Sequence, residues 1–179
     1  MKKKNTPVGR LLLIIALCFA AVFPLIAQSA AAQTAPAPDR WLTDFNEAKR
    51  IAQTENKKIL INFTGSDWCT WCHKLRDEVF STKAFLDYAN SNLVLLYVDF
   101  PNSFKLSESQ SQHNQLLASI FNIRGFPTII VLDPDLTPRL QTGYTGTSPA
   151  IYNLHLNNEK NIPSSQAAMF KQLLIRQFP

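Results

Sequence analysis

The sequence predicts an α/β fold in which a central mixed sheet carries helices on both faces. Three short apolar runs, at residues 58–64, 93–100 and 128–133, are typical of strands that are buried on both sides. Stretches with apolar residues at helical spacing alternate with these runs, which is the pattern that places a sheet between two helical layers. A fourth and more polar run at 139–145 follows the third after a short turn, and it predicts an edge strand in a terminal hairpin.

The helices are expected between and after these strands. The first, at 44–56, begins with Asp44 and Glu47 at the spacing of a capping box, and its apolar residues fall on one face. The weakly patterned stretch at 148–159 leaves helix and loop both open. The other helices are expected at about 69–80, from 82 to about 89, at 110–122 and, as an extra C-terminal helix, at 164–178.

The first 32 residues have the layout of a secretory signal peptide. Four basic residues and no acidic residue precede an apolar run at 11–27, and small residues follow it. Ala30 and Ala32 occupy the small-residue positions before a cleavage site. We therefore expect cleavage after residue 32 and export to the periplasm. The alternative is an uncleaved N-terminal anchor, for which the apolar run is barely long enough.

The rest of the chain suits a linker at 33–43 and one domain at 44–179. The full chain has a formal net charge of +5, but four of its 18 basic residues and none of its 13 acidic residues lie within 1–32. The exported chain therefore has 14 basic and 13 acidic residues, a net charge of +1. This balance gives no argument for a nucleic-acid partner. We expect a monomer that does not bind nucleic acid.

Two cysteines, Cys69 and Cys72, remain after the expected cleavage, because Cys18 lies in the signal peptide. A disulfide that closes so small a loop constrains the unfolded chain little, which favours a redox role over a structural one. At the start of a helix, free backbone N–H groups stabilise a thiolate. We therefore expect Cys69 to be the exposed catalytic nucleophile and Cys72 the shielded resolving thiol.

His73 completes the pattern Cys-x-x-Cys-His, which is also the attachment signature of c-type haem. A haem site would need a second axial ligand, for which Met169, His113 and His155 are the candidates, and buried strands have no role in a small helical cytochrome. A zinc site would need further ligands, and no other metal-binding residues cluster in the sequence. We therefore expect no cofactor and no metal.

Two motifs in combination resemble the thioredoxin superfamily over residues 44–145. Trp68-Cys69-x-x-Cys72 follows a buried strand, and Gly125-Phe126-Pro127-Thr128 leads into another strand about fifty residues later. The resemblance implies a thioredoxin-like fold and a cis peptide bond before Pro127, opposite the redox-active disulfide. It also implies a substrate-binding surface formed by Trp68, Trp71, Phe126 and Pro127.

Residues 67–75 and the following Glu78-Val79-Phe80 are most similar to the secreted group of the superfamily that includes the DsbH proteins and the C-terminal domain of DsbD. This resemblance implies a periplasmic thiol–disulfide oxidoreductase that acts on disulfide-bonded proteins or small thiols. It also implies a DsbD-type membrane protein as electron donor.

The direction of electron flow is indicated by the residues between the cysteines. Strong oxidants of the superfamily place a histidine there to stabilise the thiolate, whereas this chain has Thr70-Trp71. This difference favours a disulfide reductase over an oxidase. An isomerase usually needs a dimerisation module, for which the chain has no length. A thioredoxin-like peptide-binding module is the non-enzymatic alternative.

The sequence departs from the superfamily at the residues that handle protons. The place of a buried aspartate falls on Asn62, which cannot accept a proton, and that of a neighbouring lysine falls near Leu95. Proton transfer must then use another route, through Asp67 or water. Asp67 and His73 are the candidates for tuning the pKa of the thiols.

Overall fold

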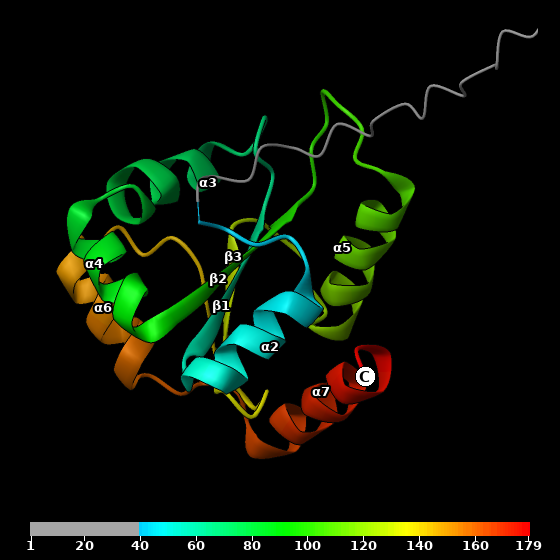
Figure 1. Ribbon diagram of the computed structural model, residues 1–179. Coiled ribbons are helices and arrows are strands. Elements are labelled where there is room, and N and C mark those ends of the chain that lie inside the picture. Colours follow the sequence, from blue (N-terminus) through cyan, green and yellow to red (C-terminus); the bar gives the residue numbers. More distant parts are fainter. Residues whose placement is uncertain (1–39) are drawn as a thin grey trace, which may run out of the picture. The chain divides into compact units, whose positions relative to one another are not determined.

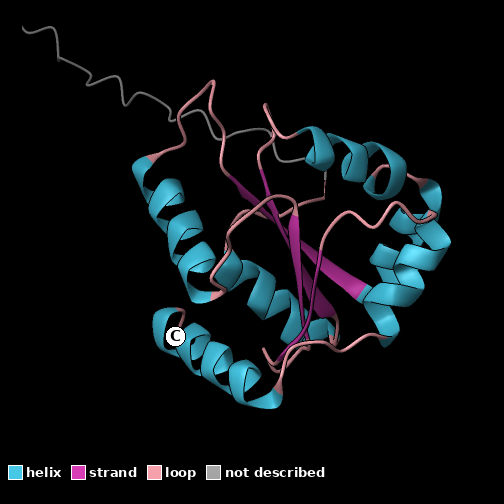
Figure 2. Ribbon diagram, turned by 180° about the vertical axis from the view of Figure 1, so that it is seen from behind, coloured by secondary structure: helices cyan, strands magenta, loops and turns pink. Residues whose placement is uncertain are grey.

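The computed structural model describes residues 40–179, which form a four-stranded sheet between two layers of helices (Figures 1 and 2). The strands are β1 (Lys58–Thr64), β2 (Leu93–Asp99), β3 (Thr128–Leu132) and β4 (Pro138–Thr142), in the order β2-β1-β3-β4. β1 and β2 are parallel, while β3 runs antiparallel to both β1 and β4. The mixed sheet with its terminal hairpin is confirmed. The expected signal peptide and most of the expected linker lie outside the described residues.

The helices divide between the two faces of the sheet (Figure 1). One face packs against α2 (Phe45–Glu55), α5 (Glu108–Ile120) and α7 (Ser164–Gln177). The other face packs against α3 (Thr70–Leu75), α4 (Lys83–Asn92) and α6 (Pro149–Asn158). In the described part of the chain, no helix is long and apolar enough to cross a membrane.

The stretch whose pattern left helix and loop open is the helix α6. Ser148 caps it by accepting a hydrogen bond from the Ile151 amide, and Pro149 occupies the first turn, where its missing N–H costs nothing. Its buried residues Tyr152 and Leu156 are four positions apart, so they form too narrow an apolar stripe to be recognised from the sequence.

The helix expected to run from the first cysteine to Phe80 changes its hydrogen bonding part of the way along. α3 continues into a π-helical turn, η2 (Arg76–Phe80), in which the Ser81 amide donates to the Arg76 carbonyl at 2.8 Å. Leu75, Val79 and Phe80 are buried, as the sequence indicated. Helical turns of this kind are frequent near functional sites.

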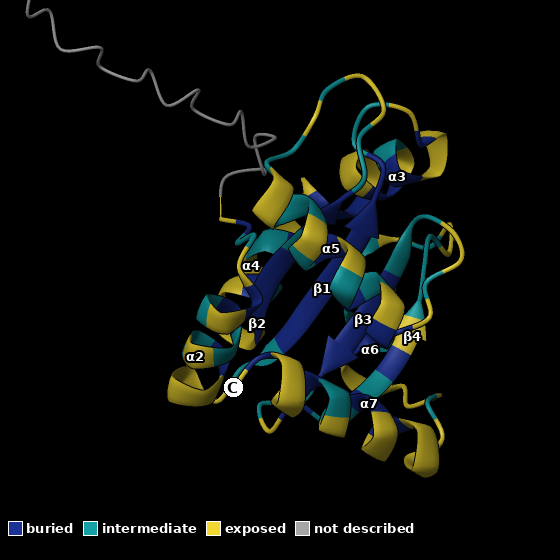
Figure 3. Ribbon diagram, turned by 90° about the vertical axis from the view of Figure 1, so that its right-hand side faces the viewer, coloured by how far each residue is buried: buried dark blue, intermediate teal, exposed yellow. Residues whose placement is uncertain are grey.

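β1 lies at the centre of the sheet and is buried over six of its seven residues, so both of its faces lie in the interior (Figure 3). Ile59, Ile61 and Phe63 belong to the core beneath α2, α5 and α7. The opposite face begins with the apolar Leu60 but continues with Asn62 and Thr64. Polar side chains are therefore buried on this face at the end of β1 that leads to the cysteines.

Residues 41–43, at the end of the stretch expected to be a linker, lie along the outer edge of β2. The Leu42 amide donates to the Leu95 carbonyl at 2.9 Å, and the Tyr97 amide donates to the Leu42 carbonyl at 2.7 Å. Trp41 is buried, and its ring lies 5.2 Å from that of Phe80. These contacts cover an edge of the sheet that would otherwise present unpaired backbone groups.

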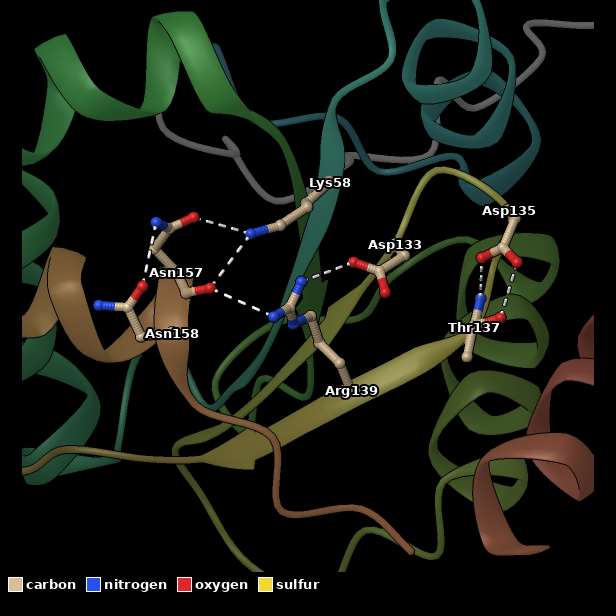
Figure 4. Close-up of polar contacts among 7 residues, drawn as sticks. All are labelled: Lys58, Asp133, Asp135, Thr137, Arg139, Asn157 and Asn158. Atoms are coloured by element: carbon tan, nitrogen blue, oxygen red, sulfur yellow. Dashed lines mark hydrogen bonds and ion pairs between the residues drawn. The ribbon is translucent and has the colours of Figure 1, made fainter. Parts of the chain in front are cut away.

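A polar network ties α6 to the sheet at the end of β1 where the strand begins (Figure 4). Arg139 of β4 forms an ion pair with Asp133 at 2.8 Å and donates to the Asn157 carbonyl at 3.2 Å. Lys58 donates to the Asn157 side chain at 2.9 Å. Partial burial lowers the pKa of Lys58.

Candidate active site

Cys69 and Cys72 lie where β1 passes into α3, and a disulfide of 2.07 Å joins them. A turn formed by Gly65, Ser66 and Asp67 separates them from the strand, and the Cys69 amide donates to the Gly65 carbonyl at 3.0 Å. Cys69 is the N-cap residue of α3, and its Sγ accepts a hydrogen bond from the Cys72 amide at 3.2 Å. The helix N-terminus therefore acts directly on the sulfur of the first cysteine.

The two cysteines do not differ in exposure, which contradicts the expectation of an exposed Cys69 and a shielded Cys72. Their exposed fractions are 5% and 6%. In the disulfide each sulfur covers part of the other, so this oxidised form does not separate them by accessibility. They are separated by their position on the helix, since Sγ of Cys69 accepts the hydrogen bond that caps it.

Two exposed tryptophans flank Cys69 in the sequence, and each contacts a further aromatic ring. Trp68 and Trp71 are 45% and 55% exposed. The Trp68 ring meets that of Phe126 edge-on at 5.7 Å, and Phe126 in turn lies 5.2 Å from Phe100. Trp71 lies 5.5 Å from Tyr144, whose hydroxyl donates to Glu78. We call the set Trp68, Trp71, Phe126 and Tyr144 the aromatic rim.

The Phe126–Pro127 peptide bond is cis, as the resemblance implied. The contact between Trp68 and Phe126 brings this turn beside the cysteine motif. The turn also lies close to the segment after β4, because a Cβ atom at Gly143 would lie only 2.9 Å from the Pro127 carbonyl oxygen. Glycine at this position therefore permits the close approach of the two backbones.

Asp67 faces the loop that follows β2. Its carboxylate accepts hydrogen bonds from the Asn102 amide at 3.0 Å and from the amide and hydroxyl of Ser103. These hydrogen bonds, that of the Ser103 hydroxyl first, lower the pKa of Asp67 to about 2. Trp68 holds the same loop, because its Nε1 donates to the Phe100 carbonyl at 2.8 Å.

Asp99 is a site residue that the sequence analysis missed. It is buried at the end of β2, and its carboxylate accepts from the Ser66 amide at 2.9 Å and from the Ser66 hydroxyl at 2.6 Å. His73 Nε2 donates to the Ser66 carbonyl at 2.8 Å, so Ser66 links Asp99 to the helix of the cysteines. Burial raises the pKa of Asp99, although the bonds from Ser66 oppose that shift. Its position as the last residue of an apolar strand was the feature of the sequence that could have identified it.

Asn62 lies in the interior behind the disulfide, beside a cavity of about 250 Å³ to which Cys72 also contributes. The register of β1 and β2 places Tyr97 opposite Asn62, whereas Leu95 pairs with Leu60. The residue across from Asn62 is therefore Tyr97, two residues further along β2 than the expected Leu95. The pKa of Tyr97 is raised to about 12, mainly by burial and also by the neighbouring charge of Asp99.

The two histidines considered as axial ligands for a haem have other partners in the fold, and the third candidate, Met169, is an exposed residue of α7. His113 Nε2 accepts from the Phe45 amide at 3.3 Å, and burial lowers the pKa of this histidine. His155 Nε2 is bonded to the Thr142 hydroxyl at 2.9 Å. Among residues 40–179, no three His, Cys, Asp or Glu side chains lie close enough to share a metal ion.

The sequence is similar to named proteins of disulfide chemistry. It is 32% identical over 108 residues to "Disulfide bond reductase DsbH" of Chlamydia pneumoniae, a match that covers 60% of this chain and 65% of that protein. It is 26% identical over 98 residues to "Thiol:disulfide interchange protein DsbD" of Actinobacillus pleuropneumoniae, which covers 55% of this chain and 15% of DsbD. The chain thus matches slightly less than two thirds of the first relative and a small part of the second.

The structure is also similar to a solved one. The structure described as "DsbH Oxidoreductase" has a TM-score of 0.62 and 30% sequence identity, and the match covers 72% of this chain and 94% of that one. The family model of the thioredoxin-like domain matches residues 45–159. This match includes the cysteine pair, the cis-proline turn and α4, α5 and α6, three of the four α-helices that follow the cysteine motif. The chain belongs to the thioredoxin-like domain family.

Proposed function

We propose that this protein is a periplasmic thiol–disulfide oxidoreductase that works as a disulfide reductase. The observation that carries the thiol–disulfide chemistry is the hydrogen bond from the Cys72 amide to Sγ of Cys69 at the start of α3. A donor that points at this sulfur, together with the other free N–H groups of the helix, favours the thiolate over the thiol. The names of the relatives, a disulfide bond reductase and a thiol:disulfide interchange protein, support the same chemistry.

The reaction follows from the two cysteines. In the reduced protein the Cys69 thiolate attacks one sulfur of a substrate disulfide, and the other substrate sulfur leaves as a thiolate that takes up a proton. Cys72 then loses its proton and attacks Sγ of Cys69, which breaks the mixed disulfide and releases the second substrate thiol. The substrate gains two electrons and two protons, and Cys69 and Cys72 end as the disulfide seen in the structure.

The substrate-binding surface in this proposal is the aromatic rim with the cis-proline turn. Trp68, Trp71 and Phe126 present apolar surface beside the disulfide. The backbone groups next to Pro127 are available to pair with an extended substrate chain. Such a surface suits unfolded or disulfide-bonded polypeptides as well as small disulfides, because it recognises apolar area and backbone and not one sequence.

The direction of electron flow is inferred from residues 70 and 71. Thr70 and Trp71 place no cation between the cysteines, and Lys74 lies over the Trp71 ring, 4.9 Å from its centre. A thiolate that receives less stabilisation makes the disulfide form a weaker oxidant. We therefore propose a reductase. A disulfide-forming oxidase is the alternative, and the measured reduction potential of the cysteine pair distinguishes the two.

The proposed location and partners follow from the N-terminal sequence and the relatives. Cleavage after residue 32 would release a monomer into the periplasm, where a DsbD-type membrane protein would reduce it. The similarity to DsbD supports a place in the same electron-transfer system. Cells can be fractionated and the N-terminus of the protein identified by mass spectrometry. A periplasmic chain that begins near Gln33 would support this location.

The activity is tested by the reduction of insulin in the presence of dithiothreitol. The proposal predicts that the purified domain accelerates insulin precipitation and that Cys69→Ser abolishes the acceleration. A peptide-binding module would bind insulin without accelerating its reduction, which would contradict the proposed function.

A further inference from the structure

A cavity lies behind the disulfide, and polar and titratable groups line it together with the resolving cysteine, Cys72. It has a volume of about 250 Å³ and lies between β1, β2, the segment at residue 41 and the start of the π-helical turn. Its polar lining comprises Asn62, Thr64, Ser66, Cys72, His73, Arg76, Ser81 and Tyr97. Trp41, Phe80 and Leu86 form the apolar part of the lining. A cavity of this size with polar groups on one side has room for several water molecules with hydrogen-bonding partners.

Asn62 is the residue whose hydrogen bonding calls for such water. It is buried, and no described residue donates a hydrogen bond to its Oδ1 atom. A buried amide without a protein partner is costly, and buried polar groups are as a rule satisfied by protein or by ordered water. The amide has a donor and an acceptor, and rotation of the side chain brings either one to the cavity.

The resolving step requires Cys72 to lose a proton, and Tyr97 and Arg76, which line the cavity, are poor acceptors for it. Tyr97 keeps its own proton, because its pKa is raised to about 12. Arg76 is held as a cation by its bond to Asp77, which raises its pKa further. Asp99 is engaged by Ser66 and does not line the cavity. His73 donates from Nε2 to the Ser66 carbonyl, so its Nδ1 carries no hydrogen, and His73 is the competing acceptor that the test below has to exclude.

We propose that Cys72 gives up its proton to water in this cavity and that Asn62 is the positioning residue for that water. The proposal rests on the proposed function. In the mixed disulfide the proton passes from Sγ of Cys72 to the water and on to bulk solvent. The Cys72 thiolate then attacks Sγ of Cys69, the bond between Cys69 and the substrate breaks, and the substrate sulfur leaves as a thiolate. Cations at the cavity, such as Arg76, favour the charged sulfur during this step.

The test measures the titration of Cys72 in a Cys69→Ser protein, from the rate of its alkylation by iodoacetamide between pH 5 and pH 10. The proposal predicts one inflection, that of the thiol itself, because no side chain at the cavity titrates as the acceptor. Asn62→Leu removes the amide from the cavity, and we expect an apparent pKa about one unit higher, which is about tenfold slower alkylation below the pKa. Asn62→Asp adds a carboxylate and should create a second inflection.

The matched control is Asn153→Leu. Asn153 also has a buried Oδ1 without a donor among the described residues, but it lies on α6 and outside the cavity. The control should leave the titration of Cys72 unchanged. If Asn62→Leu does not fold, Tyr97→Phe tests the proposal in its place. This substitution removes one hydroxyl from the cavity at nearly constant volume, and it should also raise the pKa of Cys72.

The proposal is overturned if the titration of Cys72 is the same with Asn62→Leu, or with Tyr97→Phe where the former does not fold. It is also overturned if the Cys69→Ser parent already has a second inflection that His73→Gln removes, because His73 would then be the acceptor. Insulin reduction by the wild-type domain separates the two proposals. An inactive wild type with a shifted Cys72 refutes only the proposed function, and an active wild type with an unshifted Cys72 refutes only the role of the cavity.

Discussion

The Cys72 amide donates a hydrogen bond to Sγ of Cys69 at 3.2 Å, so the sulfur of the nucleophile caps the helix on which the resolving cysteine lies. The bond comes from the backbone and is therefore kept whatever side chain stands at position 72. It lies in the first turn of α3, where three further N–H groups lack partners within the helix. The two cysteines therefore have different tasks although their exposure is nearly equal.

Substitution of each cysteine should separate these tasks. Cys69→Ser should abolish insulin reduction, because the nucleophile is lost. Cys72→Ser keeps the N-cap hydrogen bond, so it should still attack substrates but retain them as mixed disulfides that non-reducing electrophoresis detects. If mixed disulfides are recovered from the Cys69→Ser variant and not from the Cys72→Ser variant, the roles of nucleophile and resolving cysteine are reversed.

Gly65→Ala should displace Trp68 from the aromatic rim. A Cβ atom at Gly65 would lie 2.4 Å from Cε2 of the Trp68 indole, and a rigid ring can only move away as a whole. We expect loss of the hydrogen bond from Trp68 to the Phe100 carbonyl and a drop in kcat/KM of about tenfold for a protein substrate, equivalent to about 1.4 kcal/mol. The indole N–H resonance of Trp68 in NMR spectra reports the displacement.

The control for this change is Gly125→Ala, since a Cβ atom there has no atom within 4 Å. The Trp68 resonance should keep its position in the control. An unchanged Trp68 resonance in Gly65→Ala would show that the indole does not depend on glycine at this turn.

The strands could be predicted from the sequence, whereas several contacts of the candidate site could not. The strands were predictable because a short and mostly apolar run that ends at turn residues, such as residues 58–64 before Gly65, favours a buried strand over a helix. Asp99 was not, because its importance comes from Ser66, a residue 33 positions away that only folding brings to it. The partner of Asn62 also depended on the register between two strands, which the sequence does not specify.

Asp67 should stabilise the loop after β2 in a pH-dependent way. Its folded pKa of about 2 lies below the ordinary value of 3.8, so its stabilisation is fully present above about pH 4 and is lost as the pH falls toward 2. Asp67→Asn should therefore lower the Tm at pH 7, and the difference from wild type should vanish near pH 2. Thermal melts monitored by circular dichroism measure both.

Asp87→Asn is the matched control for Asp67, because Asp87 is an exposed aspartate on α4 that pairs with Lys83. The Tm of this control should change little at either pH. A Tm difference for Asp67→Asn that persists at pH 2 would contradict the role given to the charged carboxylate.

Arg139→Leu should destabilise the fold without changing the redox chemistry. The substitution leaves Asp133 without its ion-pair partner in a partly buried site and removes one of the two donors to the Asn157 carbonyl, the other being Lys58 (Figure 4). We expect a loss of about 1–3 kcal/mol in the free energy of unfolding, measured with urea. The network lies at the far end of β1 from the cysteines, so the reduction potential should not change.

Arg50→Leu serves as the control for Arg139, because Arg50 forms an exposed pair with Glu47 on α2. It should cost less than about 1 kcal/mol. Equal losses for the two variants would mean that the Arg139 network contributes no more than an exposed ion pair.

The equilibrium reduction potential of the Cys69–Cys72 pair against glutathione tests the proposed reductase most directly. The account predicts a potential close to that of thioredoxin, about −270 mV, because no cation between the cysteines stabilises the reduced form. A potential near that of the strong oxidant DsbA, about −120 mV, would contradict it and would make the protein an oxidase.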